Sequence, residues 1–135
     1  MAAAGAVVVV DGHLLLVRRG GSPAAGRWAV PAGRIEPGEA PRAAAARETR
    51  EETGLDVACR RVLIRLRLGV GGTTYDIVDF EAVPAGPAVD GLPRVRVGDD
   101  AAVVRWVPLG EVAELPLAPG MTGLVDRLAA GGGPG

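Results

Sequence analysis

The sequence predicts one α/β (α+β) domain, and three local patterns carry that prediction. An Asp-Gly pair separates two apolar runs near the N-terminus, a helix-forming stretch ends at a glycine, and two long strand-like stretches flank a glycine-rich turn. The chain has 135 residues, 48% of them hydrophobic and 23% charged, which is the size and composition of one ordinary domain. We expect residues 1–130 to form this domain and residues 131–135, which read Gly-Gly-Gly-Pro-Gly, to be a disordered tail.

The first predicted element is a β-hairpin. Residues 7–10 and 13–17 predict two strands that are apolar except for His13, and the Asp11-Gly12 pair between them supplies the two positive-φ positions that a two-residue turn needs. Less regular segments follow, namely a turn-rich stretch, a short extended segment and a Gly/Pro loop, at 20–26, 27–31 and 32–38.

The next predicted element is a helix that begins at Pro41. Proline is favoured in the first helical turn, residues 42–52 are rich in helix formers, and Gly54 is a typical stop. Ala40 is a poor N-cap, so we expect Glu39 or tertiary contacts to hold the start of the helix.

The second half of the chain returns to strands. Residues 57–68 and 73–83 predict two long strands joined by a glycine-rich turn, and residues 84–93 form a Pro/Gly-rich loop. Shorter elements complete the chain: strands at 94–97 and 102–107, and helical segments at 109–115 and 120–130.

Composition argues against several classes of protein. No apolar run approaches the ~20 residues of a membrane span, and the N-terminus lacks the basic start of a signal peptide. A single cysteine, Cys59, permits no internal disulfide, so we expect a cytoplasmic location. The fifteen basic residues, all arginines, are scattered and the net charge is −1, which disfavours binding to nucleic acid.

One helical segment carries an unusual cluster of acidic residues. Glu48, Glu51 and Glu52 stand at i, i+3 and i+4, so they share one helix face and repel one another. A solvated face partly neutralised by Arg47 and Arg50 is one reading of this pattern. The other is a hard, all-oxygen site for Mg²⁺ or Mn²⁺, because carboxylates and main-chain oxygens of the adjacent loop are the ligands these ions prefer.

The spacing of this segment resembles the Nudix box, GX5EX7REUXEEXGU, in which U is a bulky aliphatic residue. Gly33 is followed after five residues by Glu39, and after seven more by the run that begins at Arg47-Glu48 and ends at Gly54-Leu55. Thr49 is the one departure, since the family usually has Leu, Ile or Val there, and its hydroxyl can bond to the carbonyl of Ala45.

Flanking segments at 13–19, 26–33 and 105–109 also resemble those of small bacterial Nudix hydrolases. The resemblance covers most of residues 6–115. It implies an α/β/α sandwich with a mixed β-sheet between helices.

The resemblance further implies a Mg²⁺-dependent pyrophosphohydrolase, with Mn²⁺ as a possible substitute. Such enzymes cleave the pyrophosphate linkage of a nucleoside diphosphate derivative, using the metal to neutralise phosphate oxygens and activate water. Carried over to this chain, Glu48 and Glu52 are the main metal ligands, Glu51 is a ligand or the proton acceptor, and the carbonyl of Ala32 is a backbone ligand.

Other matched positions support the site rather than the metal. Arg47 orients a glutamate through a bidentate pair, Glu39 braces the loop against the helix, and Gly33 serves for its backbone conformation. Asp99 and Asp100 offer a fourth ligand or an alternative general base, although Gly-Asp-Asp is equally typical of a plain turn.

The substrate and the assembly stay open at this level. ADP-ribose, a nucleotide sugar, a dinucleoside polyphosphate and a (d)NTP all fit the box, and Trp28, Tyr75 or Phe80 either stacks on the base or packs in the core. The alternative function is a catalytically idle domain that binds nucleotide derivatives as a regulatory module. We expect a homodimer, and the loop at 84–93 is a candidate lid.

Overall fold

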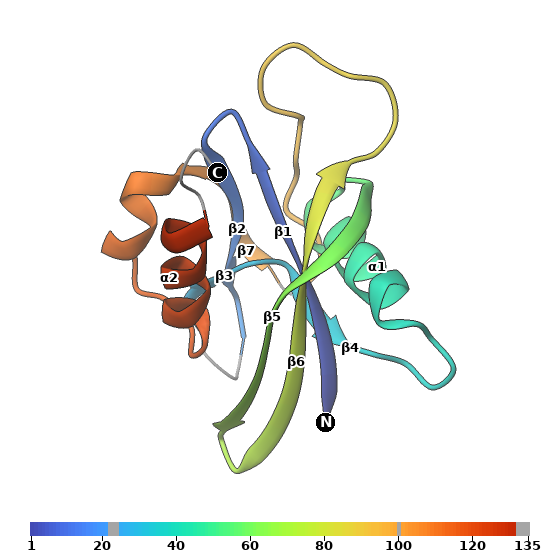
Figure 1. Cartoon of the computed structure of the whole chain (residues 1–135), viewed down its shortest axis with the longest axis vertical. Helices are drawn as coiled ribbons and strands as arrows, with labels where there is room; N and C mark the ends of the chain where they lie inside the picture. The colour runs from blue at the N-terminus through green and yellow to red at the C-terminus, as the bar shows by residue number, and fades with distance from the viewer. Residues whose placement is uncertain (22–24, 100, 132–135) are drawn as a thin grey trace.

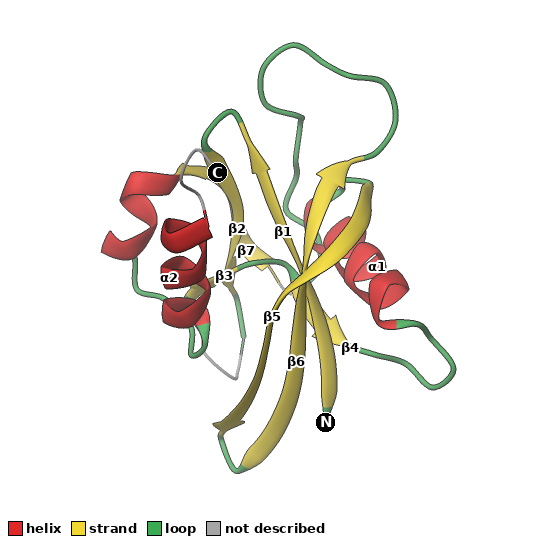
Figure 2. Cartoon of the chain, viewed as in Figure 1, coloured by secondary structure: helices red, strands yellow, loops and turns green. Residues whose placement is uncertain are grey.

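The computed structural model describes residues 1–21, 25–99 and 101–131. In this part of the chain, a seven-stranded mixed sheet lies between helices, with α1 on one face and α2 on the other (Figures 1 and 2). The predicted α/β/α arrangement is therefore confirmed. The elements in chain order are β1 (Ala2–Val10), β2 (His13–Arg19), β3 (Trp28–Ala29), β4 (Ala32–Arg34), α1 (Pro41–Thr53), β5 (Val57–Val70), β6 (Thr73–Pro84), β7 (Ala101–Pro108), η1 (Leu109–Glu114) and α2 (Met121–Gly131).

The sheet is built from two hairpins joined by one parallel pair. Strands β1 and β2 form the predicted hairpin, and Asp11 and Gly12 take φ values of 48° and 73° in its turn. Strands β5 and β6 form the second, longer hairpin, and β6 runs parallel to β1. Because β4 and β7 pair antiparallel with β1 and β2, the sheet is mixed, as expected.

Two apolar clusters fix the helices on opposite faces of the sheet. On the α1 side, Ala44 and Ala45 pack against small residues of β1, and their short side chains let the helix approach the sheet closely. On the other side, Leu124 and Met121 of α2 pack with Leu14 and Leu16 of β2. Within the described residues, neither helix is long and apolar enough to cross a membrane.

Two of the predicted local structures are wrong. The loop expected over 32–38 contains a strand, β4, because residues 32–34 pair with Ala3–Gly5 of β1. The strand expected at 94–97 is absent from the sheet, because its backbone turns instead to the end of α1. The helical segment predicted at 109–115 is present as a 3₁₀ helix, η1, that ends at Glu114.

The start of α1 agrees with the prediction, whereas the end of α2 differs. Helix α1 begins at Pro41 as predicted, and Ala40 makes no side-chain cap. Helix α2 includes Gly131, which was expected to open the disordered tail. The remainder of that tail, 132–135, lies outside the described residues.

Candidate active site

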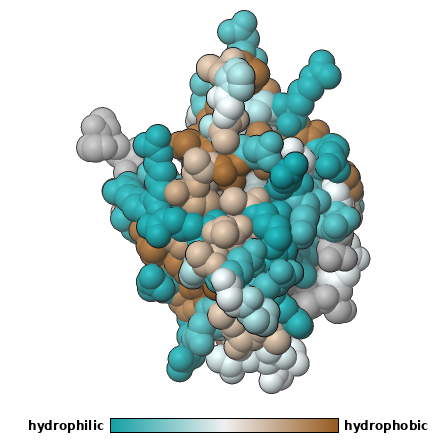
Figure 3. All heavy atoms as spheres, turned by 90° about the vertical axis from the view of Figure 1, so that its right-hand side faces the viewer, coloured by the Kyte–Doolittle hydropathy of each residue, from teal (hydrophilic) through white to brown (hydrophobic). Residues whose placement is uncertain are grey.

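Helix α1 presents one face to the core and the opposite face to a cavity. Thr49 is fully buried, and its hydroxyl donates to the carbonyl oxygen of Ala45 at 2.7 Å, as expected from the sequence. The helix ends where Gly54 adopts a φ of 77°, a left-handed conformation that glycine takes without steric cost. Hydrophilic residues cover much of this side of the molecule, which faces the viewer in Figure 3.

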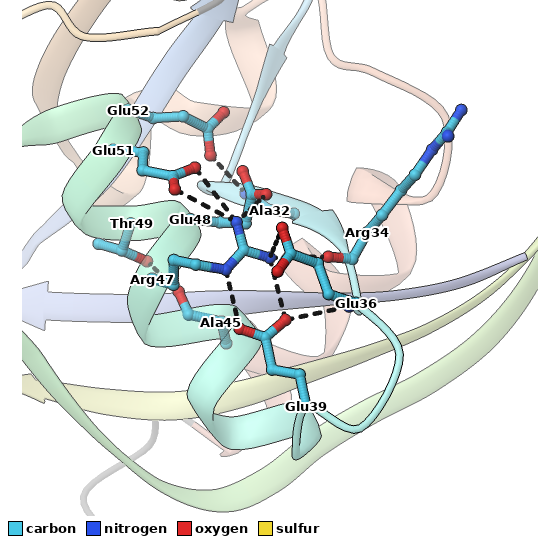
Figure 4. Close-up of polar contacts among 10 residues, drawn as sticks. All are labelled: Ala32, Arg34, Glu36, Glu39, Ala45, Arg47, Glu48, Thr49, Glu51 and Glu52. Carbon is cyan, nitrogen blue, oxygen red and sulfur yellow. Dashed lines mark hydrogen bonds and ion pairs between the residues drawn. The ribbon is translucent and has the colours of Figure 1, made fainter.

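Arg47 is the centre of the acidic cluster (Figure 4). Its Nε and Nη2 donate to the two carboxylate oxygens of Glu39 at 2.8 and 3.0 Å, which makes a bidentate pair. Its Nη1 donates to Glu48 at 2.9 Å and to Glu51 at 3.2 Å. Because Nη2 also donates to the carbonyl of Arg34 at 3.0 Å, one guanidinium ties the loop before α1 to the helix.

The carboxyl groups of this cluster differ in the direction in which their pKa values are shifted. Hydrogen bonds from Arg47 lower the pKa of Glu39 to about 2. Burial raises the pKa of Glu48, and the opposing effect of Arg47 does not cancel it. Since Glu51 shares the same guanidinium, one positive charge faces several carboxylates, and the region keeps a surplus of negative charge.

Strand β4 brings the backbone of residues 32–34 against the acidic face. The amide of Ala32 donates to Oε2 of Glu52 at 3.0 Å. The carboxyl group of Glu48 lies so close to Gly33 that a Cβ at this position would overlap it. Gly33 is therefore needed for space, a reason that differs from the backbone conformation predicted from the sequence.

These groups open into a cavity of about 600 Å³. Its polar lining includes Arg47, Glu48, Glu51 and Glu52, next to Ala32 and Gly33, while most of its other lining residues are apolar. The side chain of Arg34 points away from the carboxylates (Figure 4). The apolar lining residues are Ala3, Ala29, Val30, Leu68, Val70, Tyr75, Ile77, Ala118 and Pro119.

Of the three aromatic residues for which the sequence left base stacking and core packing open, only Tyr75 lines this cavity. Trp28 and Phe80 are 6% and 3% exposed and belong to the two apolar clusters, so of the two alternatives core packing holds for both. Their rings instead face arginines: Arg105 lies 5.6 Å from the Trp28 ring centre and Arg42 lies 5.2 Å from that of Phe80.

A backbone strap at residues 96–99 carries Asp99 to the cavity. The amides of Arg96, Gly98 and Asp99 donate to the last carbonyl groups of α1, at Thr53, Glu52 and Glu51, over 2.8 to 3.0 Å. These carbonyls have no partner inside the helix, so the strap acts as its C-terminal cap. Asp99 consequently lines the cavity beside the glutamates, whereas Asp100 lies outside the described residues.

The donor set suits a divalent metal ion in its chemistry, although the carboxylates are not gathered around one point. Across the described ranges, no group of three or more acidic, His or Cys side chains is arranged to hold an ion. The oxygens of Glu48 and Glu51 are directed at Arg47, and Glu52 is directed at Ala32. Hard oxygen ligands and surplus negative charge nevertheless match what Mg²⁺ and Mn²⁺ require.

The sequence reasoning missed two contributions to this region. Asp79 is buried on β6, two residues beyond the cavity-lining Ile77, and the alternation of Tyr75, Ile77 and Asp79 along the strand was the available signal. The strap had no such signal, because its contacts to α1 join residues more than forty positions apart.

Comparisons with known proteins agree with the resemblance carried by the box. A family model described as the NUDIX domain matches residues 1–128. The crystal structure of RenU, a Nudix hydrolase from Mycobacterium smegmatis, superposes with a TM-score of 0.74 at 30% identity, covering 97% of this chain and 84% of that one.

Two curated relatives come from Mycobacterium tuberculosis. A protein provisionally named 8-oxo-dGTP diphosphatase 2 is 33% identical over 128 residues, which is 90% of this chain and 83% of the relative. One provisionally named 8-oxo-dGTP diphosphatase 3 is 35% identical over 109 residues, which is 76% of this chain but only 47% of the relative. The chain thus spans about half the length of this second relative.

Proposed function

Because the chain belongs to the NUDIX domain family, we propose that it is a Mg²⁺-dependent pyrophosphohydrolase that cleaves the pyrophosphate linkage of a nucleoside diphosphate derivative. One observation carries the proposal: Glu48 and Glu51, which share Arg47, line a cavity of about 600 Å³, within the range of small-molecule sites. Residues 1–130 act in this proposal as one domain.

The residues around the cavity have separate roles in this proposal. Glu48 and Glu52, with the carbonyl of Ala32, would hold the metal, and the metal when bound neutralises phosphate oxygens and lowers the pKa of water. The amide of Ala32 orients Glu52. The hydrogen bonds of Arg47 to Glu39 and to the loop backbone hold the loop against the helix. The ligands on both segments therefore remain close together.

Two side chains are candidates for the general base. Glu51 is 42% exposed and lines the cavity, so its carboxylate can reach a water molecule near the phosphate end. Asp99 lines the same cavity from the strap. The two are separable by experiment, because loss of the base lowers kcat and removes the acidic limb of the pH profile, whereas loss of a spectator leaves that limb in place.

The names of the relatives indicate which substrates to test first. Both curated relatives carry names that denote hydrolysis of 8-oxo-dGTP, so nucleoside triphosphates are the first class to test. ADP-ribose, nucleotide sugars and dinucleoside polyphosphates complete the panel, because the box by itself does not choose among leaving groups.

The decisive variant is Glu52→Gln, which removes a charge at nearly constant volume. We expect kcat on the preferred substrate to fall by ~10³-fold or more, with the far-UV circular dichroism unchanged. Glu114→Gln is the matched control, because this exposed residue of η1 lies outside the cavity lining and its loss should leave kcat within twofold. Turnover by Glu52→Gln at the parent rate, or full activity in excess EDTA, would contradict the proposal.

A further inference from the structure

Asp79 is a buried acidic residue that the proposed reaction does not use. The residue is 6% exposed, and its Oδ1 is the one buried side-chain polar atom without a hydrogen-bond partner among the described residues. Burial raises the pKa of Asp79 to about 6, and no hydrogen bond or nearby cation opposes this rise. A buried carboxyl group without a partner is costly, so its position calls for a functional explanation.

Asp79 is not itself a lining residue of the cavity, but it lies next to residues that are. Tyr75 and Ile77 line the cavity from β6, and Asp79 is the next residue on the same face of that strand. Gly5 stands opposite Asp79 on β1, and a Cβ on Gly5 would overlap Oδ1. Ala32, which pairs with Gly5 from the other side, also lines the cavity.

The rest of the cavity suits a nucleoside. Arg47 and the glutamates of α1 supply charged groups for the phosphates, whereas Leu68 and Ile77 add apolar surface to the lining and Tyr75 supplies a ring. An apolar site selects for size and stacking, but a polar atom within it decides which edge of the nucleoside is accepted.

We propose that Asp79 is a specificity-determining residue that accepts a hydrogen bond from an N–H or O–H group on the nucleoside half of the substrate. The donor is an exocyclic amino group of the base or a ribose hydroxyl. An ionised carboxylate only accepts hydrogen bonds, so a carbonyl in place of the amino group meets repulsion and leaves the buried oxygen unpaired. The inference rests on the proposed nucleotide substrate and deepens it.

The test is equilibrium binding by calorimetry at pH 7.5 in EDTA, with nucleoside monophosphates as probes. CMP and UMP, AMP and purine riboside monophosphate, and GMP and IMP each differ at the position of one exocyclic amino group. CMP and dCMP differ by one hydroxyl group. Since no metal or turnover is involved, the outcome is independent of whether the chain hydrolyses a pyrophosphate.

Asp79→Asn is the main variant, because it keeps the shape of the side chain and adds a donor. Glu81→Gln is its matched control: Glu81 lies two residues further along β6, pairs with Arg61 at 3.3 Å and lies outside the cavity lining. Asp79→Ala, checked by near-UV circular dichroism, tests deletion of the group without a replacement donor.

We expect the parent to prefer the donor-bearing member of at least one pair by about 10- to 100-fold, as for a buried hydrogen bond to a charged group. Asp79→Asn and Asp79→Ala should each reduce that preference at least fivefold, and Glu81→Gln should preserve it. A preference within an amino pair identifies the base as the source, and one between CMP and dCMP identifies the ribose. Equal binding within every pair, no binding of any probe, or an unchanged preference in both Asp79 variants would overturn the proposal.

Discussion

Replacing Asp79 with Asn should change how stability depends on pH. The pKa of Asp79 is about 6 in the folded protein and ordinarily 3.8, so the folded state retains the proton over the interval between these values. Folding stability is therefore lost as the pH rises from about 4 to 6, and the full cost is present above pH 6. At 1.36 kcal/mol for each pKa unit, the difference of about 2.2 amounts to about 3 kcal/mol.

About 1 kcal/mol of this cost is already present at pH 4.5, where the unfolded chain is largely ionised at this position, which leaves about 2 kcal/mol between pH 4.5 and pH 7.5. Asn has no such dependence. Going from pH 4.5 to 7.5, the stability of Asp79→Asn relative to the parent should therefore improve by about 2 kcal/mol, or ~6 °C in Tm.

Urea unfolding of both proteins at the two pH values measures this change directly. Any pH-independent effect of the amide on packing cancels, because only the change in the difference between the two proteins is used. Contributions of the other carboxyl groups cancel in the same way. A relative stability that stays constant from pH 4.5 to 7.5, or that moves in the opposite direction, would refute the view that Asp79 is buried without a partner.

Three further variants test the geometry of the site. Gly33→Ala should lower kcat at least ~10-fold with the fold retained, because the new Cβ displaces the carboxyl group of Glu48. Steady-state kinetics measures this, with circular dichroism to check the fold, and an unaffected kcat would contradict it. Gly98→Ala should destabilise the protein by ~1–3 kcal/mol in urea, because its Cβ overlaps the carbonyl of Glu51 and displaces the strap; stability equal to the parent would show that the strap does not cap α1. Glu39→Gln should lower the stability of the fold at pH 6 but not near pH 2. The depressed pKa of Glu39 gives stabilisation that is present above its ordinary value of 4.5 and is lost as the pH falls through about 2. Acid titration of both proteins measures this, and a stability difference that persists at pH 2 would count against the pair with Arg47.

The expectations from sequence were correct where the interactions join residues close together in the chain. The Asp11-Gly12 turn, the start of α1 at Pro41 and the bond from Thr49 to Ala45 all depend on neighbours within four residues, and all are found in the structure. The glutamate face of α1 follows from helical periodicity in the same way.

Expectations that depended on distant neighbours were less reliable. Residues 32–34 look like a loop because glycine and proline surround them, yet pairing with β1 makes them a strand. Trp28 and Phe80 look as available for stacking as Tyr75, and only their position on the sheet separates core from cavity.

The sequence by itself determined the family, the mixed α/β fold and the set of carboxylates, because these follow from local periodicity and from one continuous run of residues around Arg47. Only the tertiary structure decided that Asp99 reaches the cavity, that Gly33 makes room for Glu48 and that Asp79 is buried next to residues that line the cavity. The physical reason is that these placements depend on contacts across the sheet and on the orphan carbonyls at the end of α1, which join segments far apart in the chain.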